Sequence, residues 1–131
     1  MMFLTKSDLL EIHRRAIAEF GGSQGILNEG ALESALVAAE NRAWYENADM
    51  VGCAAAYAFH LTSAHAFVDG NKRVAAAATE TFVLINEAQI DASDDDLYHF
   101  FIGIASGTCP RDQVEDWLRS HITAKSRRQS G

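Results

Sequence analysis

The chain has 131 residues, of which 48% are hydrophobic and only one is proline. This composition excludes an intrinsically disordered chain, and the length suits one domain with a real hydrophobic core. The formal net charge of −7 argues against direct nucleic-acid binding, because phosphate contacts need a basic surface. With no apolar run of membrane-spanning length and no secretory signal in the first residues, we expect a cytoplasmic protein that does not enter a membrane.

The first third of the sequence predicts two amphipathic helices. Thr5 or Ser7 can cap the first helix, Gly21-Gly22 ends it, and Asn28 opens the second. Each helix has apolar residues spaced for one buried face. These residues are Leu9, Leu10, Ile12, Ala16, Ile17 and Phe20 in the first helix, and Leu32, Ala35, Leu36 and Ala39 in the second.

The rest of the chain predicts four more helices. Segments 50–64 and 74 to about 88 are apolar, and the second is apolar nearly all round, which predicts the central buried helix. Ser93 caps a fifth helix that ends near residue 107, and Pro110 begins a last amphipathic one with residues 114, 117, 118 and 122 facing inward. We therefore expect an all-α fold of about six helices, with one domain over 1–123 and a flexible tail over 124–131.

The two central helices are joined by the stretch His65-Ala66-Phe67-Val68-Asp69-Gly70-Asn71-Lys72-Arg73. It predicts a tight polar loop and a helix that starts at Asn71 with free backbone N–H groups facing the loop. Such a helix start suits phosphate, because unpaired N–H groups and the helix dipole both favour negative charge. A polar loop without a function is the alternative, but nine clustered residues of this kind favour a functional site.

Two residues of this stretch can activate a nucleophile and hold a metal. The imidazole of His65 can accept a proton from a hydroxyl group, as histidines do in general base catalysis. Asp69 is a hard oxygen ligand suited to one position on Mg²⁺, with phosphate oxygens and water at the others.

The remaining residues suit anion binding. Gly70 permits a sharp turn close to a ligand. Asn71 can cap the helix that follows this stretch and offer its amide to a phosphate. Lys72 supplies a point charge, and Arg73 supplies a planar fork that grips phosphate oxygens. Together with His65 and Asp69, these are the groups that phosphoryl or nucleotidyl transfer needs.

This stretch resembles the signature of the Fic/Doc superfamily, His-x-Phe-x-Asp/Glu-Gly-Asn-Gly/Lys-Arg, with every defined position filled. Most Fic enzymes have Gly-Asn-Gly-Arg with a further Arg three residues later, and transfer AMP to a protein hydroxyl. This chain has Lys72 and Ala76 at those two positions, as the death-on-curing (Doc) toxins do. The segment from Ala18 to Leu36 is also of the Doc type, so the resemblance covers nearly the whole chain.

The resemblance implies a compact helical bundle and a toxin that is a protein kinase. In the Doc branch ATP is held reversed, with Mg²⁺, so that the γ-phosphoryl group meets a threonine of translation elongation factor Tu and translation stops. The implied catalytic residues are His65, Asp69 and Arg73, the nucleotide-binding residues are Gly70, Asn71, Lys72 and Arg73, and the metal ligand is Asp69. An AMP (nucleotidyl) transferase and a catalytically silent nucleotide- or antitoxin-binding module are the alternatives.

The resemblance also predicts how the protein is restrained. Self-restrained Fic proteins have an inhibitory Ser/Thr-x-x-x-Glu-Gly/Asn, and none of the three Glu-Gly or Glu-Asn pairs of this chain has Ser or Thr four residues before the Glu. We therefore expect a protein antitoxin of the Phd type to inhibit this chain in trans.

Other residues support weaker expectations. Trp44 and Tyr45 are either a satellite of the core or part of the short flap that, in Fic-like folds, precedes the catalytic helix and pairs with the target. His13, His99 and His121 are scattered along the sequence, so we expect them at surface or capping positions and not in a site.

Overall fold

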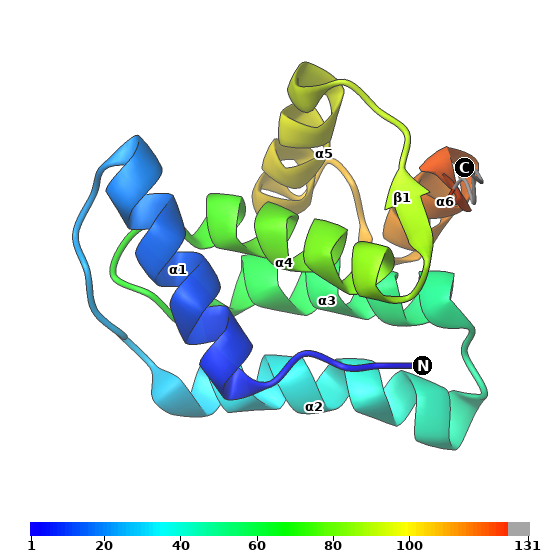
Figure 1. The fold of residues 1–131 in the computed structure, drawn as a ribbon, viewed down its shortest axis with the longest axis horizontal. Coiled ribbons are helices and arrows are strands. Elements are labelled where there is room, and N and C mark those ends of the chain that lie inside the picture. Colours follow the sequence, from blue (N-terminus) through cyan, green and yellow to red (C-terminus); the bar gives the residue numbers. More distant parts are fainter. Residues whose placement is uncertain (126–131) are drawn as a thin grey trace, which may run out of the picture.

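The computed structural model describes residues 1–125, within which six helices account for most of the chain (Figure 1). The all-α fold predicted from the sequence is confirmed. The helices are α1 (Lys6–Phe20), α2 (Glu29–Glu46), α3 (Met50–Ala64), α4 (Asn71–Ile85), α5 (Asp94–Ser106) and α6 (Arg111–His121). Two short strands, β1 (Ala88–Ile90) and β2 (Ile122–Ala124), pair antiparallel with Gln89 opposite Thr123. Within residues 1–125 no helix is long and apolar enough to cross a membrane.

Side-chain caps fix the helix starts that the sequence predicts. Thr5 forms a capping box with Asp8, since each side chain accepts a hydrogen bond from the other residue's backbone N–H. The side chain of Asn28 caps α2, and Ser93 caps α5 through the N–H of Asp96. These caps satisfy N–H groups that have no partner inside the helix.

The central helix is α3, not α4 as the sequence predicted. Helix α3 packs against α2, α4, α5 and α6, and nine of its fifteen residues are buried, compared with six of fifteen in α4. The prediction failed because the end of α4 is solvent-exposed at Leu84 and Ile85 despite its apolar sequence. Small side chains at 54–56 and 58 let neighbouring helices approach α3 closely.

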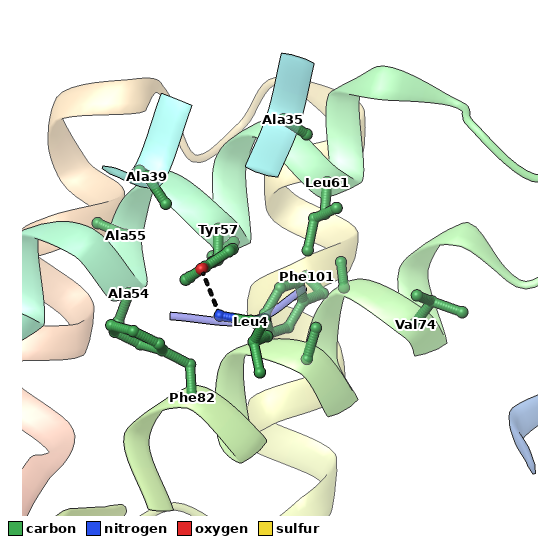
Figure 2. Close-up of a cluster of buried hydrophobic side chains, with 14 of the residues drawn as sticks. Leu4, Ala35, Ala39, Ala54, Ala55, Tyr57, Leu61, Val74, Phe82 and Phe101 are labelled. Atoms are coloured by element: carbon green, nitrogen blue, oxygen red, sulfur yellow. Dashed lines mark hydrogen bonds between the residues drawn. The ribbon is translucent and has the colours of Figure 1, made fainter. Parts of the chain in front are cut away.

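Aromatic rings fill the centre of the core between α3 and α4 (Figure 2). The rings of Tyr57 and Phe82 lie 4.8 Å apart, and both residues are fully buried. The Tyr57 hydroxyl accepts a 2.9 Å hydrogen bond from the backbone N–H of Leu4. This bond holds the segment before α1 in the core and satisfies a buried polar group.

Two helix ends differ from the sequence prediction. Helix α4 ends at Ile85 because the Asn86 side chain donates to the Phe82 carbonyl and Glu87 takes a positive φ of 65°. The chain then enters β1, so Ala88 lies in a strand. Ile122 likewise begins β2 instead of ending the last helix.

The expected domain boundary after residue 123 falls inside β2, and the N–H of Lys125 still bonds to the Glu87 carbonyl. The remainder of the expected tail, residues 126–131, lies outside the described residues.

Trp44 and Tyr45 form neither an extended flap nor a part of the core. Both lie in the last turn of α2, which continues to Glu46, and their side chains are 72% and 83% exposed. The prediction failed because this segment, although less regular in its apolar spacing, stays helical up to Asn47, which caps α2 in a left-handed conformation.

Candidate active site

The signature stretch forms a short loop between α3 and α4, as the sequence predicts. His65 ends α3 in a left-handed conformation with φ 49°, and its side chain is exposed. The next two residues, Ala66 and Phe67, are buried, whereas Val68 and Asp69 are exposed. The loop is therefore anchored at Phe67 and presents polar groups on both sides of that anchor.

Asn71 holds this loop together instead of capping α4. Its Oδ1 accepts from the Phe67 N–H at 3.0 Å, and its Nδ2 donates to the Phe67 carbonyl at 2.9 Å. The residue that precedes α4 is Gly70, whose φ of 79° suits glycine and which offers no side-chain cap. The expected role of Asn71 is therefore corrected: its amide positions the loop.

The start of α4 is open to an anion. The first N–H that bonds back into the helix is that of Val74, which donates to the Gly70 carbonyl at 2.9 Å. The N–H groups of residues 71–73 precede this bond, at the positive end of a 15-residue helix. This arrangement is the one expected for a phosphate site.

An extended segment between α1 and α2 lies along the signature loop. The N–H groups of Leu27 and Asn28 both donate to the Ala66 carbonyl, at 2.7 and 3.0 Å, and Val68 donates to the Gly25 carbonyl at 3.1 Å. Ile26 forms an isolated antiparallel bridge with Phe67. Backbone pairing with residues 25–28 thus supports the loop over its middle part.

Asp69 is held but remains accessible. Its Oδ2 accepts from the Ser23 N–H at 3.3 Å, and its Oδ1 accepts from the Gly70 N–H at 2.9 Å. The described residues contain no group of three or more His, Cys, Asp or Glu side chains around a possible ion. A single exposed carboxylate beside a phosphate-binding turn fits Mg²⁺, which commonly takes one or two carboxylates together with phosphate oxygens and water.

The two cations of the signature stand beside this carboxylate. A cavity of about 180 Å³ is lined by Asp69, Gly70, Asn71, Lys72 and Arg73, together with residues of α1 and Tyr98. The guanidinium of Arg73 lies 3.9 Å from the centre of the Phe20 ring. No carboxylate of residues 1–125 is paired with Lys72 or Arg73, so both charges are free to meet an anion.

His65 is the one predicted site residue that does not line this cavity. It belongs to the same loop, and its side chain is exposed. The structure thus brings five of the six predicted site residues around one cavity and leaves His65 on the surface at the other end of the loop.

A larger cleft of about 450 Å³ adjoins the cavity and shares Lys72, Arg73 and Tyr98 with it. Helix α4 contributes Ala76 and Glu80 to its lining. Burial, together with the charge of Asp94, raises the pKa of Glu80. Because Ala76 is small, no side chain from that position extends into the cleft.

Sequence reasoning placed His13 on the surface, whereas the structure buries it under the signature loop. Its ring is only 4% exposed, stacks on Phe67 at 4.0 Å between centroids, and has Nε2 3.0 Å from the Asp69 carbonyl oxygen. The sequence did contain a signal for this burial, because His13 has helical spacing with Ile17 and Phe20. Ile17 lines the cavity and Phe20 lines the adjoining cleft. His99 is exposed and His121 is half-buried, away from the loop.

Comparison with known proteins agrees with this geometry. The chain is 28% identical over 120 residues to the protein kinase Doc of Escherichia phage P1, an alignment that covers 91% of this chain and 94% of the phage protein. The profile of the Fic/DOC family matches residues 3–83, a range that includes α1, the extended segment, the signature loop and most of α4. The chain therefore belongs to the Fic/DOC family.

Proposed function

We propose that this protein is a toxin of the Doc type, a protein kinase that transfers the γ-phosphoryl group of ATP to a threonine of elongation factor Tu and thereby arrests translation. The likeness to phage P1 Doc over almost the full length of both chains supports the kinase branch. The observation that carries the proposal is the open, cationic start of α4 beside a single carboxylate, with Lys72 and Ala76 at the two positions that distinguish Doc from AMP-transferring relatives.

In this proposal His65 acts as the general base. Its exposed imidazole accepts the proton of the threonine hydroxyl while that oxygen forms a bond to the γ-phosphorus. The bond between the γ-phosphorus and the β,γ-bridging oxygen breaks, and ADP leaves with its electron pair. Exposure of His65 suits a large substrate, because a protein-borne hydroxyl must reach the imidazole from solvent.

The other residues stabilise the charge on the phosphates. The N–H groups of residues 71–73, the Lys72 ammonium and the Arg73 guanidinium donate hydrogen bonds to phosphate oxygens. Asp69 holds Mg²⁺, which supplies further neutralisation of phosphate charge. Gly70 keeps the turn open, since a Cβ at this position would lie 3.2 Å from Cδ1 of Ile17.

Inhibition comes, in this proposal, from a Phd-like protein antitoxin in the cytoplasm. No carboxylate within residues 1–125 forms an ion pair with Arg73, which leaves its guanidinium accessible to an inhibitor supplied in trans. The net charge of −7 suits a basic protein partner better than nucleic acid.

The test is label transfer to purified elongation factor Tu with Mg²⁺, run in parallel with γ-labelled and α-labelled ATP. Label from the γ position alone is the expected result. Label from the α position would instead establish the alternative, an AMP transferase that uses the same residues with ATP reversed. ATP binding without transfer from either position would identify a catalytically silent nucleotide- or antitoxin-binding module.

A further inference from the structure

One face of α1 lies against the signature loop. His13, Ile17 and Phe20 follow one another at spacings of four and three residues, which places them on the same side of the helix. Each meets a different part of the loop: His13 meets Asp69, Ile17 lies beside Gly70, and Phe20 lies beside Arg73. The active-site loop is therefore packed along a helix that contains none of the signature residues.

His13 contacts the loop in two ways. A carbonyl oxygen can only accept a hydrogen bond, so Nε2 of His13 must be the protonated nitrogen that donates to the Asp69 carbonyl at 3.0 Å. The same ring is stacked on Phe67 with an angle of 9° between the planes. The hydrogen bond fixes the backbone of Asp69 and the stack fixes the anchor two residues earlier, so His13 holds the backbone from which the Asp69 carboxylate projects.

Phe20 contacts the other end of the site. Its ring lies under the guanidinium of Arg73 at 3.9 Å, and the Tyr98 ring lies at 5.8 Å. Stacking on a ring face uses the plane of the guanidinium and leaves its N–H groups, which point outward in that plane, free for phosphate oxygens. Phe20 is 54% exposed, so this contact lies at the surface. There it restricts the Arg73 side chain, which would otherwise sample many rotamers in solvent.

We propose that His13 and Phe20 are positioning residues with separate tasks: His13 orients Asp69 for Mg²⁺, and Phe20 holds Arg73 for the nucleotide phosphates. This inference rests on the proposed function. It predicts two different defects from two residues of one helix, whereas a general loss of helix stability would give the same defect for both.

For His13, the informative variants are His13→Phe and His13→Gln. Phenylalanine keeps a ring to stack on Phe67 but has no donor, and glutamine keeps an N–H donor but has no ring. We expect His13→Phe to raise the Mg²⁺ concentration for half-maximal transfer about tenfold, as loss of a group that orients a metal ligand does. His13→Gln should recover part of this loss, and ATP binding without Mg²⁺ should stay at the wild-type level in both.

For Phe20, the pair is Phe20→Leu and Phe20→Tyr. Leucine is apolar but has no π face, so we expect the dissociation constant of ATP to rise about threefold, with and without Mg²⁺. Tyrosine keeps the π face and should bind ATP like wild type. The Mg²⁺ concentration for half-maximal transfer should not change in either variant.

The deciding measurement is ATP binding by titration calorimetry, with and without Mg²⁺, alongside the transfer assay. Thr5→Ala serves as the control, because it removes the cap of α1 and lowers helix stability without touching the loop. Thr5→Ala should lower the melting temperature and leave both binding responses unchanged. The inference is wrong if His13→Phe needs the same Mg²⁺ concentration as wild type. It is also wrong if His13→Phe and Phe20→Leu only lower the melting temperature, as Thr5→Ala does. If the wild-type protein does not bind ATP, the proposed function fails, and the inference fails with it.

Discussion

A Cβ atom placed on Gly22 would lie only 2.7 Å from Oδ2 of Asp69, although the two residues are 47 positions apart in the chain. The adjacent N–H of Ser23 donates to the same oxygen. The glycine pair after α1 therefore does more than end a helix, because Gly22 leaves the space that the carboxylate of Asp69 occupies.

This relationship predicts different effects for two neighbouring substitutions. Gly21→Ala and Gly22→Ala both place alanine at a positive φ, 85° and 117°, in backbone conformations that glycine alone adopts readily, so each should cost about 2 kcal/mol of stability. Only Gly22→Ala pushes on Asp69, since a Cβ atom on Gly21 would have no neighbouring atom within 4 Å. We expect Gly22→Ala to raise the Mg²⁺ requirement of transfer about tenfold. Equal Mg²⁺ titrations of the two variants would contradict this.

Removal of the proposed base should abolish transfer and spare the fold. His65 is exposed and left-handed, so asparagine, which tolerates this conformation, is a better replacement than alanine alone. We expect His65→Asn and His65→Ala to lose at least a hundredfold in transfer rate. Circular dichroism should give melting temperatures close to wild type, and transfer at the wild-type rate would show that the base is another group.

Positions 72 and 76, which differ between Doc and its AMP-transferring relatives, can be substituted together. The double variant Lys72→Gly and Ala76→Arg restores the pattern of the AMP transferases, and the cleft above Ala76 has room for the larger side chain. We expect label from γ-labelled ATP to fall at least tenfold and label from the α position to appear. Each single variant is the matched control. If the double variant still transfers the γ-phosphoryl group, residues other than Lys72 and Ala76 set the orientation of ATP.

The buried hydrogen bond of Tyr57 predicts a stability loss away from the site. Burial raises the pKa of its phenol to about 12, so the hydroxyl is neutral at every physiological pH. Tyr57→Phe leaves the Leu4 N–H without an acceptor in the core, which costs roughly 2 kcal/mol. Urea unfolding should show this loss, while Tyr45→Phe, at an exposed position, should unfold like wild type. A loss below about 0.5 kcal/mol would mean that water replaces the phenol.

Acid stability should depend on Asp49. Hydrogen bonds from Arg119 and from the N–H of Gly52 lower the pKa of its carboxyl to about 2. A lowered pKa in the folded state contributes stability above the unfolded value near 3.8, and this contribution is lost as the pH falls towards 2. Because the Asp49 side chain is 57% exposed, solvent screens the pair and we expect only about 0.5 kcal/mol.

Thermal melts of wild type and Asp49→Asn across this range provide the measurement. The two melting temperatures should differ at pH 7 and converge between pH 4 and pH 2. The Asp49 side chain also caps the start of α3 by accepting from the Gly52 N–H, so a difference that does not depend on pH would assign the effect to this cap instead of the charge.

The sequence alone determined the helical class and the location of the candidate site. Apolar spacing and the caps at Thr5, Asn28 and Ser93 are local signals, so they were sufficient to predict the helix starts. The signature residues 65–73 are contiguous, and their chemistry could therefore be inferred without knowing what surrounds them.

Only the tertiary structure decided what packs against the signature loop. The contacts of His13 with Asp69 and of Gly22 with the same residue join positions about fifty residues apart, and no local pattern encodes such a pairing. The structure also shows that the Asn71 amide bonds to the Phe67 backbone instead of capping α4. The core is centred on α3 and not on α4, because burial depends on the neighbours of a helix, while hydrophobic spacing describes the helix alone.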